Sequence, residues 1–174
     1  MSKNHKKKDL SSVEIPDLEQ IEKVKVGVVV SEWNEKITGK LLEGCRDTLI
    51  EAGVHSENLK VIHVPGSFEL PFGAKLLIGR DHPDAVICLG CVIQGETKHN
   101  EYINMAVSQS ISQLSLFSNI PIIYGVLTPD TMKQAEDRAG GKHGNKGVEA
   151  AATALRMIAL KQTMKGGKKK IGFG

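Results

Sequence analysis

Residues 85–103 read AVICLGCVIQGETKHNEYI and contain the change of pattern that decides the fold. Their first five residues form an apolar run that predicts a buried strand, and residues 97–117 have the spacing of a long helix with Thr97 as its N-cap. The short polar loop between these two patterns holds Glu96, Thr97 and His99. In an open parallel sheet, ligands bind where strands end and helices begin. This loop is therefore the first candidate for a functional site.

The loop combines an anion site with a group that can transfer protons. The first N–H groups of a helix have no partner within the helix and carry partial positive charge, so they can bind an anion. The imidazole of His99 can transfer protons near neutral pH. A single histidine early in a helix is more often an ordinary surface residue, so spacing alone leaves its role open. The combination favours chemistry on a phosphorylated small molecule.

The rest of the chain alternates between strands and helices. Strands are predicted at residues 23–31, 59–64, 84–93 and 121–128, and helices at residues 35–52, 68–79, 97–117, 130–139 and 145–164. This alternation predicts an α/β fold, a three-layer sandwich in which helices cover both faces of a four-stranded parallel sheet. In residues 13–15 apolar and polar residues alternate as in a short strand, which Pro16 would restrict to a sheet edge. This strand is a candidate to join a neighbouring subunit's sheet.

The length of 174 residues predicts one domain with basic ends. Residues 1–9 hold four lysines and one aspartate, and residues 165–174 hold four lysines and no acid, which leaves residues 10–164 mildly acidic. We expect residues 1–12 to be a disordered leader, residues 13–164 a single domain, and residues 165–174 a flexible tail. No basic face with interleaved aromatic residues accompanies these ends, so we expect no specific nucleic-acid binding.

Composition also bounds the cellular setting and the metal content. No apolar run reaches the length of a membrane span, and no apolar segment of a signal peptide follows the basic start. The three cysteines are an odd number and show no disulfide pattern, which is typical of a protein in the reducing cytoplasm. The histidines and cysteines show no paired metal-ligand spacing, so we expect no metal. Cys88 and Cys91 lie three apart within a predicted strand, which points them to opposite faces and favours structural thiols over a redox pair.

Five motifs follow one another along the chain. They are SEWN at residues 31–34, VPGSFELP at 64–71, GCVIQGETKHNEY at 90–102, YGVLT at 124–128 and QAEDRAGGKHGNKG at 134–147. In sequence and order they resemble the motifs of the lumazine synthase family, and the resemblance covers residues 22–162. Asn100 is a departure, because the family usually has an aromatic residue there.

The resemblance implies a flavodoxin-like fold and a transferase of riboflavin biosynthesis that needs no cofactor. Its reaction would condense 5-amino-6-(D-ribitylamino)uracil with 3,4-dihydroxy-2-butanone 4-phosphate to give 6,7-dimethyl-8-ribityllumazine, with release of phosphate and water. The family's sites lie between the subunits of a homo-oligomer. We therefore expect a pentamer and, because the turn at residues 140–147 is short and glycine-rich as in shell-forming members, a 60-subunit shell. Riboflavin synthase is a candidate partner.

The resemblance also assigns roles to individual residues. His99 is expected to be catalytic. The ribitylaminouracil is expected to bind Trp33, Ser67, Phe68, Glu69, Cys91, Val92, Ile93 and Tyr124, and the phosphate is expected to bind Glu96, Thr97 and Arg138. Tyr124 and Arg138 would reach the site from an adjacent subunit. General chemistry agrees with these roles, since an indole can stack on a flat ring and a guanidinium can bind phosphate through two hydrogen bonds.

The residues taken by themselves leave ordinary structural roles open. Trp33 could be a core aromatic residue, although its polar neighbours argue against burial. Tyr124 could simply face the core from its strand. Arg138 could complement the dipole at the end of a helix, and Glu69 could do the same at the start of one.

Three other functions remain as alternatives. A flavin-binding electron carrier would need a Ser/Thr/Gly-rich loop after the first strand, where this chain has SEWNEK at residues 31–36. A related riboflavin synthase acts on two lumazine molecules without phosphate, so the presence of Glu96, Thr97 and Arg138 favours the enzyme that eliminates phosphate. A non-catalytic shell protein would not require His99 and Arg138.

Overall fold

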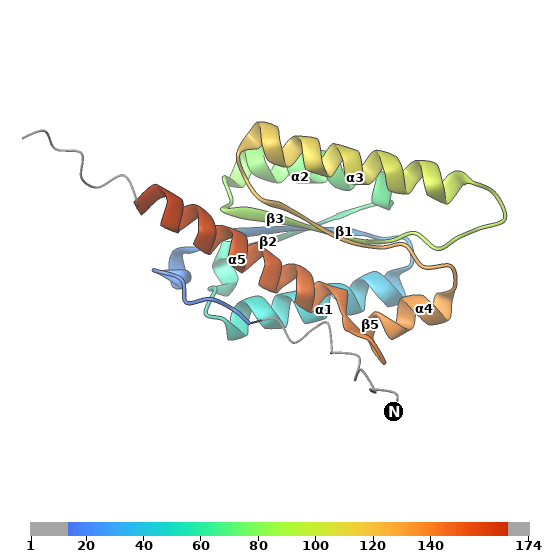
Figure 1. Cartoon of the computed structure of the whole chain (residues 1–174), viewed down its shortest axis with the longest axis horizontal. Helices are drawn as coiled ribbons and strands as arrows, with labels where there is room; N and C mark the ends of the chain where they lie inside the picture. The colour runs from blue at the N-terminus through green and yellow to red at the C-terminus, as the bar shows by residue number, and fades with distance from the viewer. Residues whose placement is uncertain (1–13, 167–174) are drawn as a thin grey trace, which may run out of the picture.

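A four-stranded parallel sheet in the order β2-β1-β3-β4 forms the centre of the protein. The computed structural model describes residues 14–166, so the predicted leader and most of the predicted tail lie outside the described residues. The strands are β1 (Val26–Ser31), β2 (Leu59–Val64), β3 (Ala85–Cys91) and β4 (Ile122–Leu127). Helices lie on both sides of this sheet (Figure 1), which confirms the predicted three-layer α/β fold.

The two central strands are the most apolar segments of the chain. Every residue of β1 and β3 is buried, whereas the edge strand β2 is only half-buried. The two central strands run side by side in register, with Val29 opposite Cys88 and Val30 opposite Leu89. Strands that are buried on both faces have continuous apolar sequences. The apolar runs of β1 and β3 could therefore be recognised in the sequence alone.

Helices cover both faces of the sheet (Figure 1). The helices α1 (Glu35–Glu51) and α5 (Lys146–Gly166) lie on one face, and α2 (Leu70–Asp81) and α3 (His99–Ser118) lie on the other. Each face has its own hydrophobic core, and Cys91 belongs to the first core while Cys88 belongs to the second. The predicted opposite orientation of the two thiols is confirmed. Burial raises the pKa of Cys88 to about 12 and that of Cys91 to about 11.

The start of α3 differs from the prediction. The helix begins at His99 with Lys98 as its N-cap, so Thr97 is not the capping residue. Instead the Thr97 hydroxyl accepts a hydrogen bond from the backbone N–H of His99 at 3.4 Å. A threonine that bonds the backbone two residues further on forms a local turn, which competes with helix formation at that position. The loop before α3 therefore extends two residues further than the pattern indicated.

The predicted helix at residues 130–139 is also shorter. It is α4 (Met132–Asp137), capped by the Thr131 hydroxyl, and a hairpin of β5 (Ala139–Gly141) and β6 (Gly144–Asn145) follows. Gly140 and Gly144 have φ angles of 96° and 80°, which are accessible to glycine at little cost. The backbone therefore leaves the helix here and turns sharply into α5.

Smaller differences occur at other element boundaries. A short 3-10 turn (Ile21–Lys23) replaces the predicted start of β1, and another (Ser67–Glu69) precedes α2, whose first turn contains Pro71 as expected. Residues 14–18 have no regular structure in the single chain, and Val13 lies outside the described residues, so the added strand stays a prediction.

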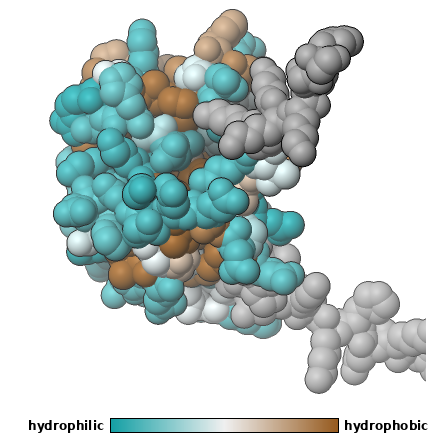
Figure 2. Space-filling model, turned by 90° about the vertical axis from the view of Figure 1, so that its left-hand side faces the viewer, coloured by the Kyte–Doolittle hydropathy of each residue, from teal (hydrophilic) through white to brown (hydrophobic). Residues whose placement is uncertain are grey.

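The surface is mixed in character. Figure 2 views the end of the molecule opposite the loop that joins β3 to α3, and there hydrophobic side chains form separate patches in a mostly hydrophilic face. Within residues 14–166, none of the helices combines the length and the apolar character that crossing a bilayer requires.

Candidate active site

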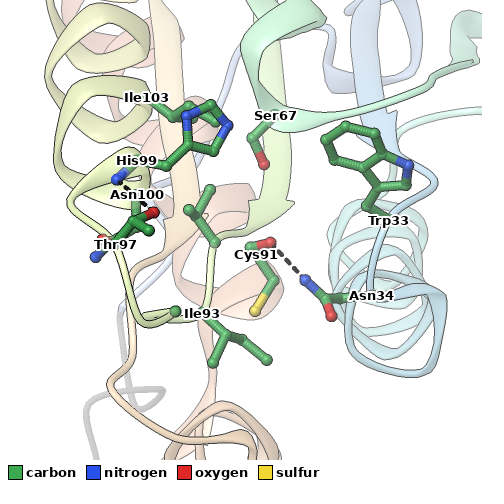
Figure 3. Close-up of a pocket in the computed structure, with 11 residues that line it drawn as sticks. Trp33, Asn34, Ser67, Cys91, Ile93, Thr97, His99, Asn100 and Ile103 are labelled. Carbon is green, nitrogen blue, oxygen red and sulfur yellow. Dashed lines mark hydrogen bonds between the residues drawn. The ribbon is translucent and has the colours of Figure 1, made fainter.

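The candidate site lies at the carboxyl ends of β1 and β3. The chain leaves β1 toward β2 on one side and leaves β3 toward β4 on the other, so the two crossovers diverge at this point. Such a switch point is where open α/β sheets bind their ligands. A cavity of about 250 Å³ opens here, and the predicted residues that line it are Trp33, Ser67, Cys91, Val92, Ile93, Thr97 and His99 (Figure 3).

A second cavity of about 620 Å³ borders the first. The two cavities share Trp33, His99 and Ile103, and the second adds the predicted residues Phe68 and Glu69. Nine of the predicted site residues, from four separate segments of the chain, are therefore brought to one end of the sheet.

Trp33 is 64% exposed beside the cavity. The residue follows β1, and its backbone N–H donates to the Pro65 carbonyl at 3.1 Å, which continues the pairing between β1 and β2. A Cβ at residue 66 would lie 2.9 Å from the ring, so glycine at this position allows the chain to pass beside the indole. The backbone is thus fixed while one ring surface remains open, as stacking on a planar ligand requires.

Asn34 is a site residue that sequence reasoning missed. Its Nδ2 donates to the carbonyl of Cys91 at 2.9 Å and thereby ties the end of β1 to the end of β3 (Figure 3). Its φ is 61°, a left-handed conformation that asparagine tolerates better than most residues. Asn34 is the N-cap of α1, but its side chain makes no capping hydrogen bond there, so the local pattern carries no signal for the contact with Cys91.

His99 is the first residue of α3 and lies across the cavity from Trp33 (Figure 3). Its side chain is exposed, as is that of Thr97. Asn100 and Ile103 also line the first cavity, so the unusual Asn100 is part of the pocket wall. Ile103 was missed, although it lies four residues after His99 and therefore on the same face of the helix.

The Glu69 carboxylate has a defined local role. Its Oε2 accepts a hydrogen bond from the backbone N–H of Gly66 at 3.0 Å. The side chain therefore fastens the turn that precedes α2, while the residue stays half-exposed at the second cavity.

Three predicted residues do not line either cavity. Glu96 is exposed in the loop before α3. Tyr124 lies within β4, half-buried against the core beneath α2 and α3, and burial raises the pKa of its phenol. Arg138 is the C-cap of α4, as the dipole interpretation suggested.

The guanidinium of Arg138 is held by groups of its own chain. Its Nη1 donates to the His143 carbonyl at 2.5 Å, and its Nη2 lies 2.8 Å from a carboxylate oxygen of Glu149. The other oxygen of Glu149 lies 3.2 Å from Nζ of Lys146. Glu149 thus anchors two cations near the β5–β6 hairpin.

Comparison with known proteins decides the family. The sequence matches the family model described as 6,7-dimethyl-8-ribityllumazine synthase over residues 23–162, which include every predicted site residue. The chain belongs to this family. A lumazine synthase of Parabacteroides distasonis is 51% identical over 150 residues, covering 86% of this chain and 94% of the relative.

Two other relatives carry the same name. The 6,7-dimethyl-8-ribityllumazine synthase of Cytophaga hutchinsonii is 54% identical over 154 residues, covering 87% of this chain and 95% of the relative. That of Bacteroides fragilis is 54% identical over 135 residues, covering 78% of this chain and 94% of the relative. The resemblance seen in the five motifs is therefore confirmed as membership of the lumazine synthase family.

Proposed function

We propose that this chain is a transferase of riboflavin biosynthesis. It condenses 5-amino-6-(D-ribitylamino)uracil with 3,4-dihydroxy-2-butanone 4-phosphate to give 6,7-dimethyl-8-ribityllumazine, phosphate and water. Family membership over residues 23–162 carries the proposal. The cavity at the end of the sheet supports it, because it joins a ring suited to stacking with a group suited to proton transfer.

The uracil binds between Trp33 and the end of β3. The exposed indole stacks on the flat heterocycle, while the backbone of residues 91–93 meets its polar edge. The hydrogen bond from Asn34 to the Cys91 carbonyl holds this backbone in place. The buried Cys91 thiol, whose pKa is raised to about 11, stays protonated and takes no part as a nucleophile.

His99 moves protons between the reacting groups. The amine of the uracil attacks the ketone, and loss of water gives an imine. Phosphate then leaves, and the ribityl-bearing amine closes the ring on the remaining carbonyl with loss of a second water, which completes the lumazine. Each step transfers protons to or from nitrogen or oxygen, which suits an imidazole near neutral pH. The enzyme also contributes proximity, since the two substrates must meet in one orientation.

A neighbouring subunit completes the phosphate site. Among the described residues that line the two cavities there is no lysine or arginine, although the phosphorylated substrate is an anion. The backbone N–H groups at the start of α3 and the Thr97 hydroxyl supply part of the site. Arg138 of an adjacent subunit supplies the cation, because a guanidinium can bind phosphate through two hydrogen bonds.

The exposed apolar residues around the second cavity support this sharing. Phe68, Phe72, Tyr102 and Met105 are each more than half exposed, and three of them line that cavity. Clustered exposed apolar side chains indicate an interaction surface. We propose that a second subunit covers them in a pentamer, that twelve pentamers form a 60-subunit shell, and that the assembly works in the cytoplasm with riboflavin synthase as a partner.

Two measurements test the proposed function. The first follows the absorbance of the lumazine product when the purified protein is mixed with both substrates, and absence of product would refute the activity. The second mixes His99→Ala and Arg138→Ala subunits during assembly. If one site needs His99 of one subunit and Arg138 of the next, random mixing at equal amounts restores about a quarter of the sites. No recovery above the separate variants would refute shared sites.

A further inference from the structure

Two serine hydroxyls lie at the floor of the candidate active site, one lining the cavity and one behind it. Ser31 is the last residue of β1 and is fully buried, and its Oγ has no hydrogen-bond partner among the described residues. Ser67 begins the turn before α2, is 4% exposed and lines the cavity. In Figure 3 its hydroxyl lies between the rings of Trp33 and His99.

Gly90 brings the two hydroxyls together. The residue lies next to Ser31 in the sheet, one position beyond the pair Val30 and Leu89. A Cβ at residue 90 would lie 2.6 Å from Oγ of Ser67 and 3.4 Å from Oγ of Ser31. The two oxygens are therefore no more than about 6 Å apart, a gap that a rotamer change or one water molecule can close. A side chain at residue 90 would fill that gap.

A buried hydroxyl without a partner is unfavourable, and folded proteins rarely keep one. Removal of a hydroxyl that serves only the fold should therefore cost stability, whereas removal of an unpartnered one should not. The position of Ser31 behind a residue that lines the cavity offers a reason for keeping it, namely a bond that forms in the ligand-bound state.

We propose that Ser31 is a positioning residue for ligand binding. When a ligand fills the cavity, the Ser31 hydroxyl donates a hydrogen bond to Oγ of Ser67, directly or through one water. Ser67 then donates its own hydrogen to an acceptor oxygen of the ligand. The identity of that ligand, the ribityl-bearing heterocycle, rests on the proposed function; the pairing of the two hydroxyls rests on their placement around Gly90.

The Ser31→Ala variant of the full assembly tests this proposal by two effects of opposite sign. Its melting temperature should equal or exceed that of the wild type, because the substitution removes an unpartnered buried hydroxyl. Its Kd for 6,7-dimethyl-8-ribityllumazine, measured by fluorescence titration, should rise about 3- to 10-fold, the value of one net hydrogen bond. The KM for the uracil substrate should rise by a similar factor, with that for the phosphorylated substrate unchanged.

Ser115→Ala is a matched control. Ser115 donates to the Ile120 carbonyl at 3.0 Å and accepts from the Ile122 N–H at 3.2 Å, and it does not line either cavity. This variant should lose stability and keep the wild-type Kd. The same chemical change thus gives the opposite result when the hydroxyl serves the fold.

A double-mutant cycle with Ser67→Ala completes the test. If the two hydroxyls act as a couple, Ser31→Ala should have no further effect on Kd once Ser67 is alanine. An unchanged Kd in Ser31→Ala, additive effects in the double variant, or a Ser31→Ala protein that is less stable or fails to fold would each overturn the proposal. Absence of product formation and lumazine binding by the wild type would instead refute the proposed function.

Discussion

The contact between α5 and α1 at Gly147 allows a sharp test of how the segment proposed to bind phosphate is positioned. A Cβ at residue 147 would lie 2.7 Å from the carbonyl carbon of Leu41 and closer still to its oxygen. Asn145 fastens the same junction, because its Nδ2 donates to the Lys40 carbonyl at 2.9 Å and its Oδ1 accepts from the Gly147 N–H at 2.8 Å. The hairpin that follows Arg138 is therefore docked on α1 through this point.

Gly147→Ala should push the two helices apart. The overlap is with backbone, so no rotation of a side chain can relieve it. Overpacking costs about 1–3 kcal/mol, and each weakened hydrogen bond of Asn145 adds about 0.5–1.5 kcal/mol. The gain from alanine in a helix offsets about 0.5–1 kcal/mol of this. We expect the free energy of unfolding to fall by about 1–5.5 kcal/mol, and the melting temperature by about 2–22 °C.

Gly39→Ala is the matched control on α1. A Cβ there would have no neighbour within 4 Å, so this variant should gain about 0.5–1 kcal/mol from helix propensity. Urea and thermal unfolding should compare the variants at one protein concentration, because assembly makes stability depend on concentration. The KM for the phosphorylated substrate should also rise in Gly147→Ala, since Arg138 moves with the hairpin. Equal stability of the two alanine variants would refute the reasoning.

Three further predictions concern catalysis, phosphate binding and assembly. His99→Ala should slow product formation by about 100- to 10,000-fold with the assembly intact, and a wild-type rate in the absorbance assay would remove His99 from the mechanism. Arg138→Ala should weaken binding of the phosphorylated substrate by about 2–5 kcal/mol, whereas equal weakening of the uracil in calorimetric titrations would contradict a phosphate-specific role. Light scattering near neutral pH should show the 60-subunit shell; an isolated pentamer would exclude the shell, and a monomer would exclude shared sites.

The parts of the fold that the sequence predicts well are those that local apolar pattern controls. The strand at residues 59–64 was predicted with its observed bounds, and the buried run at residues 85–91 was recognised because both faces of β3 are covered. The turn that Thr97 forms and the hairpin around Gly140 were missed. In both places hydrogen bonds and backbone torsions of single residues outweigh the periodicity of the segment.

The same distinction between local pattern and distant contacts applies to the residues of the candidate site. Trp33 and His99 could be predicted to meet, because each follows a strand that ends at the same edge of the sheet. Asn34 and Ser31 could not be recognised, since their importance depends on groups far away in the sequence. Asn34 bonds a carbonyl 57 residues further along the chain, and Ser31 lies beside Gly90 of the neighbouring strand. Such contacts depend on how neighbouring strands are aligned in the sheet, and a local sequence pattern does not determine that alignment.

The placement of Arg138 bears on why the site should need two subunits. In a single chain α3 covers one face of the sheet, while α4 and the hairpin that follows it lie on the other (Figure 1). Arg138 is also held on its own side by His143 and Glu149. To reach the cavity of the same chain, the guanidinium would have to leave both partners and pass around the end of the sheet. A second subunit can supply the guanidinium to this cavity while its Arg138 keeps its contacts with His143 and Glu149. We therefore expect the ion pair with Glu149 to orient the guanidinium toward the neighbouring subunit's cavity.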